Sequence, residues 1–266
     1  MTDPIITLTT DFGTSDHLVG AMKGVILSIN PVARIVDLQH HVAPFDVLDG
    51  ALTIGAAWHY FPPRTIHLVI VDPGVGTERR PLLVTAEAQH FIAPDNGVLS
   101  MVYDRDPYVS VRHITASHNF LNPVSPTFHG RDVFAPVAGW LSKAWQSESF
   151  GEVITDFVRF GLPKPKSSGQ ALKGLVLKVD TFGNLITNLR TEDVPPATIE
   201  SGKIKLQAGA KAVERFVLTF GQGAPGEPVA LIGSSGFLEI AVNKGNAART
   251  LGVARGAEVT LEIPTA

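Results

Sequence analysis

The apolar pattern of the chain changes near Arg159, and this change most constrains the fold. Before it, short apolar runs alternate with two segments of helical apolar spacing, residues 18–29 and 46–60. Strands that alternate with helices predict an α/β domain with a mostly parallel, Rossmann-like sheet and helices on both faces. After Arg159 only short strand-like runs between turns follow, and these predict a smaller all-β, barrel-like domain.

A segment rich in proline, serine and lysine, residues 161–169, separates the two patterns and has the composition of a linker. We therefore expect an α/β domain at residues 1–162, a linker at 163–170 and a β domain at 171–266. The strands expected in the β domain are residues 175–179, 185–189, 204–206, 216–220, 229–232, 237–242 and 259–263.

Composition narrows the chemistry. With 44% hydrophobic residues, 18% charged residues and a net charge of −3, the chain is typical of a soluble globular protein. It gives no reason to expect a nucleic acid or a membrane as a partner. The lack of cysteine excludes disulfides and thiolate chemistry, and His40 and His41 lack the spacing of metal ligands, so we expect no metal site. No signal peptide or apolar run of ~20 residues is visible, which makes a cytoplasmic location the default.

The loop after the apolar run 66–71 carries the first candidate site. Asp72 follows a buried strand, and ligands of α/β sheets bind at the carboxyl ends of strands. Gly74 and Gly76 permit unusual backbone conformations. The loop is no dinucleotide fingerprint, because Arg79 replaces the third glycine and a strand follows. The alternative interpretation is a tight turn capped by Asp72 with Arg79 on the surface.

Two further polar positions stand at element boundaries. His129 precedes a glycine and a helix expected over residues 132–145, with Asp132 as its N-cap. A helix start favours polar or anionic partners, and histidine is the side chain that most easily acts as a base near neutral pH. Asp11 follows the first strand, where a carboxylate commonly receives ribose hydroxyls.

Two polar turns stand out in the β half. Residues 180–184 and 233–236 are glycine-containing segments between apolar strands, and structurally they indicate hairpin turns. Functionally, the hydroxyls and amide groups near Ser234 could hold a carboxylate, and Asp180 could hold an ammonium group.

Six segments occur in a specific order: residues 10–16, 71–77, 93–97, 128–132, 182–184 and 233–236. Together they resemble the S-adenosyl-L-methionine (SAM) hydrolases, also called SAM hydroxide adenosyltransferases or the DUF62 family, which are relatives of fluorinase and chlorinase. The resemblance implies that SAM and water give adenosine and L-methionine, with SAM as the substrate and no cofactor. It also implies a homotrimer whose sites lie between the N-terminal domain of one subunit and the C-terminal domain of its neighbour.

The resemblance assigns roles to individual residues. The family's catalytic set corresponds to Asp72, Arg79 and His129, and the family's spacing of seven positions selects Arg79 over Arg80. The other implied roles are substrate contacts: Asp11 to the ribose, Phe45 and Phe128 to adenosine, Asn184 to adenine with Phe182 packed nearby, Asp180 to the methionine ammonium and Ser234 to its carboxylate.

Two alternatives remain beside hydrolysis. One is a SAM-dependent halogenase, but Asp72 stands where halogenases carry an uncharged tyrosine, and an ionised carboxylate repels halide and favours water. The halogenases also carry arginines at the positions of Ser235 and Val242, so the methionine end differs. The other alternative is a non-catalytic protein that binds SAM or adenosine.

Overall fold

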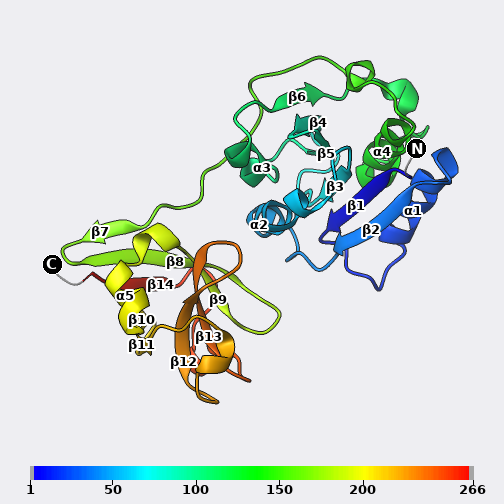
Figure 1. Ribbon diagram of the computed structural model, residues 1–266. Helices are drawn as coiled ribbons and strands as arrows, with labels where there is room; N and C mark the ends of the chain where they lie inside the picture. The colour runs from blue at the N-terminus through cyan, green and yellow to red at the C-terminus, as the bar shows by residue number, and fades with distance from the viewer. Residues whose placement is uncertain (1–2, 264–266) are drawn as a thin grey trace. The chain divides into compact units, whose positions relative to one another are not determined.

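The chain folds into two compact units, and the division along the sequence falls between Gly161 and Leu162. The computed structural model describes residues 3–263 and is shown in Figure 1. Within this range, no helix is both long and apolar enough to cross a membrane. Each unit has its own buried apolar cluster, and each is described by itself below.

The first unit is built on a mixed sheet of six strands in the order β2-β1-β3-β5-β4-β6. The β1, β2, β3 and β5 strands pair in parallel, which matches the expected alternation, whereas β4 pairs antiparallel with β5 and β6. The β4–β5 hairpin could not be predicted from the sequence. Its turn residues Glu87 and Ala88 adopt positive φ, but neither is a glycine or an asparagine, the residues that usually mark such a turn. The strands are β1 (Ile5–Thr10), β2 (Arg34–Gln39), β3 (Ile66–Ile70), β4 (Pro81–Ala86), β5 (Gln89–Pro94) and β6 (Ser110–His113).

Helices cover both faces of this sheet (Figure 1). The residues of β3 and its extension alternate between two apolar clusters: Leu68 and Ile70 pack with α1 and α4, while Val69 and Val71 pack with α2 and α3. This two-sided burial explains why the sequence around β3 is continuously apolar. The helices are α1 (Leu18–Ile29), α2 (Val47–Ala57), α3 (Ser100–Arg105) and α4 (Ala135–Ser142).

The first two expected helices are confirmed, and the third is wrong at its start. The Asp46 side chain accepts a hydrogen bond from the Asp49 N–H at 3.0 Å and caps α2. Asp132 is no cap, because Gly130–Phe134 forms a π-helical turn and α4 begins only at Ala135. The buried Asp132 carboxylate instead accepts from the Ser125 N–H at 2.7 Å and from Arg131 Nε at 2.5 Å.

The second unit is an antiparallel, nearly closed and barrel-like sheet with the order β11-β10-β14-β8-β9-β13-β12, and β7 pairs with β8. An isolated parallel bridge joins Phe216, the residue after β11, to Ala230 of β12, the strand at the other edge of the sheet. Alternate residues fill its interior, as the predicted strands require. The strands are β7 (Lys166–Ser168), β8 (Ala171–Val179), β9 (Leu185–Arg190), β10 (Lys203–Ala208), β11 (Lys211–Arg215), β12 (Pro228–Ile232), β13 (Phe237–Val242) and β14 (Glu258–Glu262).

Three local expectations in this half are wrong. The strand expected at residues 216–220 is displaced to β11, and Phe220–Gln222 forms a 3₁₀ turn. Three residues of the expected linker form β7. Two short helices, α5 (Pro196–Ser201) and α6 (Ala247–Leu251), occur where none was expected, because helices this short show no apolar periodicity.

Candidate active site

The candidate site of the first unit lies at the carboxyl ends of β1 and β3. These parallel neighbours place Thr10 opposite Ile70, so Asp11 and Asp72 leave the sheet at the same edge. Asp72 continues the alternation that turns Leu68 and Ile70 toward α1 and α4. The Asn96 side chain donates to the Val71 carbonyl at 2.8 Å and holds the chain immediately before Asp72.

Asp72 and Arg79 form a buried, two-point ion pair. Arg79 Nε donates to Asp72 Oδ1 at 3.0 Å, and Arg79 Nη2 donates to Asp72 Oδ2. The two side chains are only 5% and 9% exposed, so the alternative of a surface arginine is wrong. A two-point contact fixes the plane of the carboxylate as well as its position.

His129 joins this pair through the same guanidinium. Arg79 Nη2 lies 2.9 Å from His129 Nδ1. Arginine has only donors, so Nδ1 must accept, and the neutral ring then carries its proton on Nε2. Burial, followed by the positive charge of Arg79, lowers the pKa of His129 below its ordinary value. The neutral ring therefore presents an N–H donor at its far side near neutral pH.

The glycines of the loop make this arrangement possible. Gly76 has φ of +78°, and a Cβ there would collide with the Pro126 carbonyl, which belongs to the segment leading to His129. A Cβ on Gly74 would lie 3.3 Å from Arg79 Cγ. The two glycines thus bring the loop against the His129 segment and let Arg79 fold back onto Asp72.

Arg80 is directed elsewhere. Its guanidinium donates to Asp95 Oδ2 at 2.8 Å and to Asp156 Oδ1 at 2.8 Å, and Asp95 also accepts from the Val158 N–H at 2.7 Å. Arg80 therefore ties β4 to the segments around Asp95 and Asp156. The geometry separates the two adjacent arginines, and only Arg79 faces Asp72.

Three residues expected to hold an adenosyl group also gather around the end of β1. Asp11 Oδ2 accepts from the Phe45 N–H at 2.8 Å. Phe45 has φ of +64° and is 74% exposed. Phe12, next to Asp11, meets Phe128 edge to face at 6.1 Å between ring centroids. The structure thus connects Asp11, Phe45 and Phe128 within one region of the first unit.

In the second unit, Asp180, Phe182 and Asn184 share one turn. Asp180 Oδ1 accepts from the N–H groups of Phe182 at 2.9 Å and Asn184 at 2.8 Å, and Oδ2 accepts from Asn184 Nδ2 at 2.9 Å. Phe182 is 74% exposed. Ser234 is exposed in the separate turn between β12 and β13.

Sequence reasoning missed Phe134, whose ring lies 5.1 Å below the Arg79 guanidinium. Such a contact favours a fixed guanidinium position. No sequence signal distinguishes Phe134 from an ordinary core residue of the expected helix, and its ring is in fact fully buried.

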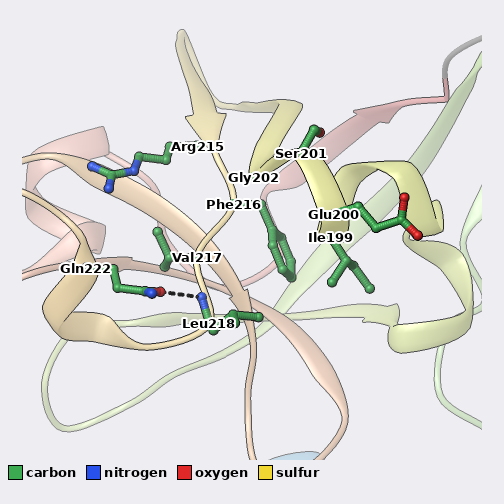
Figure 2. Close-up of a pocket in the computed structure, with 9 residues that line it drawn as sticks. All are labelled: Ile199, Glu200, Ser201, Gly202, Arg215, Phe216, Val217, Leu218 and Gln222. Carbon is green, nitrogen blue, oxygen red and sulfur yellow. Dashed lines mark hydrogen bonds between the residues drawn. The ribbon is translucent and has the colours of Figure 1, made fainter.

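Two other features do not contribute to this site. His40 is engaged by Thr10 Oγ1 and Asp37 Oδ1, both at 2.9 Å, and residues 3–263 contain no group of three side chains suited to hold a metal. Figure 2 shows a cavity in the second unit, where Gln222 accepts from the Leu218 N–H at 2.7 Å. None of the expected site residues lines it; its walls are Ile199, Glu200, Ser201, Gly202, Arg215, Phe216, Val217, Leu218 and Gln222.

Comparison with known proteins covers both units. Models of the SAM hydroxide adenosyltransferase N-terminal and C-terminal domains match residues 6–151 and 174–260. An "(R)-S-adenosyl-L-methionine hydrolase" of Salinispora tropica is 35% identical over 95% of both chains. A "Fluorinase" of Actinoplanes sp. is 30% identical over 97% of both chains. An uncharacterized conserved protein of Thermotoga maritima superposes with a TM-score of 0.89, at 37% identity, over 96% of this chain and 99% of that one. The chain belongs to the SAM hydroxide adenosyltransferase family.

Proposed function

We propose that this protein hydrolyses SAM to adenosine and L-methionine by attack of water or hydroxide at C5′. The observation that carries the proposal is the buried cluster of Asp72, Arg79 and His129 at the carboxyl ends of β1 and β3. Similarity to relatives named (R)-S-adenosyl-L-methionine hydrolase supports it. Because the sulfonium makes methionine a good leaving group, the reaction requires only a positioned nucleophile, with SAM as substrate and no cofactor.

We assign a separate role to each of the three residues of the cluster. Arg79 fixes Asp72 and His129 relative to each other through one guanidinium. In the proposed mechanism His129 Nε2–H donates to the oxygen of the nucleophile, and an unused lone pair of the Asp72 carboxylate accepts one of its protons. The oxygen then keeps a lone pair for C5′, in line with the departing sulfur.

Asp72 is the better proton acceptor of the two. His129 Nδ1 already accepts from Arg79, and Nε2 carries the ring proton. As the C–O bond forms, the protons on the attacking oxygen become strongly acidic, so a weakly basic carboxylate is sufficient. The balanced step forms the C5′–O bond, breaks the C5′–S bond and transfers one proton from water to Asp72, which later releases it.

The remaining site residues are proposed to hold SAM. Asp11 retains Oδ1 for the ribose hydroxyls, since Oδ2 accepts from the Phe45 N–H. The other proposed contacts are Phe45 and Phe128 with adenosine, Phe182 and Asn184 with adenine, and Asp180 and Ser234 with the methionine end. On the family resemblance we also propose a homotrimer in which the C-terminal groups serve a neighbouring subunit; sedimentation equilibrium should then give three times the chain mass.

The similarity to a fluorinase makes a halogenase the second candidate. Purified protein with SAM, with and without added chloride, distinguishes the two activities. Adenosine and methionine in both reactions are the expected products. Formation of 5′-chloro-5′-deoxyadenosine would favour the halogenase, and unchanged SAM after long incubation would favour a binding protein.

A further inference from the structure

Glu239 is a buried carboxyl without a hydrogen-bond partner among residues 3–263. It lies in the middle of β13, is only 8% exposed, and is surrounded along the strand by apolar residues. A carboxyl this little exposed rarely lacks a partner. Its oxygens are not fully buried, so they remain within reach of a ligand. Its position therefore calls for an explanation beyond the packing of the barrel.

The strand register brings Glu239 between the two polar turns of the second unit. Glu239 pairs with Leu231 on β12 and with Ile186 on β9. Its Oε1 occupies the space over Gly233 so closely that a Cβ there would collide with it. The carboxyl thus lies against the turn that carries Ser234, and Gly233 is required to admit it.

The second polar turn contributes a like charge. Burial, followed by the negative charge of Asp180, raises the pKa of Glu239. The Asp180 carboxylate accepts three hydrogen bonds within its own turn, one from Phe182 and two from Asn184, whereas Glu239 accepts none from residues 3–263. Most acceptor sites of Asp180 are therefore used by its own turn, whereas those of Glu239 are all available to a ligand.

A compact cation with hydrogen-bond donors fits this arrangement best. It would compensate the repulsion between the two carboxyls and satisfy the unpartnered oxygens of Glu239. A primary ammonium group has these properties. The nearby Ser234 hydroxyl and the amides of its turn suit a carboxylate, so the combination matches an α-amino acid group.

We propose that Glu239 is the substrate-binding carboxylate that receives the α-ammonium group of the methionine part of SAM. Asp180 adds negative charge and shapes the neighbouring turn. The proposal deepens the proposed function and depends on SAM being the substrate. It makes Glu239 a determinant of specificity for the amino acid end.

The test compares Glu239→Gln with the parent protein on two substrates: SAM, and an analogue in which hydrogen replaces the α-ammonium. Loss of a charge-assisted hydrogen bond should lower kcat/KM for SAM about 10- to 100-fold, chiefly through KM. The kcat/KM for the analogue should change little. As a control, Glu258→Gln removes an exposed carboxylate that pairs with Lys173 at 3.0 Å, and it should affect neither substrate.

A structural role would give a different result. An equal loss on both substrates, or no loss on SAM, would overturn the proposal. The thermal midpoint of Glu239→Gln should equal or exceed that of the parent, since the amide removes a buried charge beside Asp180; a marked fall would indicate a folding role.

Binding separates this proposal from the proposed reaction. In an Asp72→Asn background, SAM should raise the melting temperature more than the analogue does, and adding Glu239→Gln should abolish that difference. Equal stabilisation by the two compounds, or none by either, overturns the ammonium site whether or not SAM is hydrolysed. If SAM stabilises the Asp72→Asn protein more than the analogue does, but the parent protein does not hydrolyse SAM, the ammonium site stands and the proposed reaction is refuted.

Discussion

Asp72, just past the end of β3, and Glu239, in the middle of β13, are both buried carboxyls, but their surroundings are opposite. Asp72 is held at two points by Arg79, which also contacts His129. Glu239 has no hydrogen-bond partner in the described part of the chain and faces the like charge of Asp180. The Asp72 carboxyl is held in its position by Arg79 before any ligand binds, as a preorganised catalytic group requires. In our proposal the Glu239 carboxyl gains a partner only when the ammonium group of the substrate binds, which is typical of a recognition site.

Removing the Asp72 charge should give the largest effect. Asp72→Asn keeps the shape but loses the proton acceptor, so kcat should fall roughly 10²-fold or more with little change in SAM binding. Adenosine formation and SAM binding are measured separately. Arg80→Lys is the matched control, because Arg80 binds Asp95 and Asp156 instead, and it should turn over SAM near the parent rate. Parent-level turnover by Asp72→Asn would refute the assignment.

Substitutions of His129 test whether it donates or accepts. His129→Ala should lower kcat roughly 10²-fold, whereas His129→Gln retains a side-chain N–H and should recover part of that loss. If His129 acts as the base, Gln should be as poor as Ala.

The pH profile gives a second readout of His129. Burial and Arg79 lower its pKa, so the ring stays neutral until the pH falls well below its ordinary value. Protonation then removes the acceptor for Arg79, and kcat of the parent should decline on the acid side. That acid limb should be absent in His129→Gln, and an unchanged limb would assign it to another group.

The loop geometry is tested by Gly76→Ala. The new methyl meets both a positive φ and the Pro126 carbonyl, so it should displace Arg79, lower kcat and destabilise the protein by about 3 kcal/mol. Gly226→Ala is the control, since φ there is +84° but nothing lies within 4 Å of the added Cβ. It should cost about 1 kcal/mol and leave kcat intact. Equal effects of the two changes would mean that backbone strain, not the close approach, matters.

A smaller effect concerns stability in acid. Burial lowers the pKa of His67 to about 4, and the neutral ring bonds Thr7 Oγ1 at 2.8 Å and Gln89 Oε1 at 2.6 Å. The unfolded chain binds this proton more tightly, so stability is full above pH ~6.5 and falls as the pH drops toward 4, by about 3 kcal/mol. Urea unfolding of His67→Gln should show a weaker pH dependence over this window, while exposed His118→Gln should match the parent.

The sequence predicted the two-part architecture because apolar periodicity reports burial directly. It predicted the parallel strands around β3 and two helices: α1, which ends before Asn30, and α2, which Asp46 caps. The π-helical turn at Gly130–Phe134 could not be predicted from the sequence, because this turn results from tertiary packing and from the contacts of the buried Asp132.

The candidate site shows the same division. Asp72, Arg79 and His129 were selected by family resemblance, and only the fold shows that one guanidinium joins them. Phe134 and Glu239 were missed because each looked like an ordinary strand or helix position. Phe134 matters because its ring contacts Arg79, and Glu239 matters because Gly233 leaves space for its carboxyl. Neither contact can be read from the sequence.

The central claim is direct attack of water at C5′ by the cluster around Asp72. Incubation of the protein with SAM in ¹⁸O-labelled water, followed by mass spectrometry of both products, tests it most directly. The account predicts one labelled oxygen, at the 5′ position of adenosine, and unlabelled methionine. Label in methionine, or adenosine without label, would contradict it.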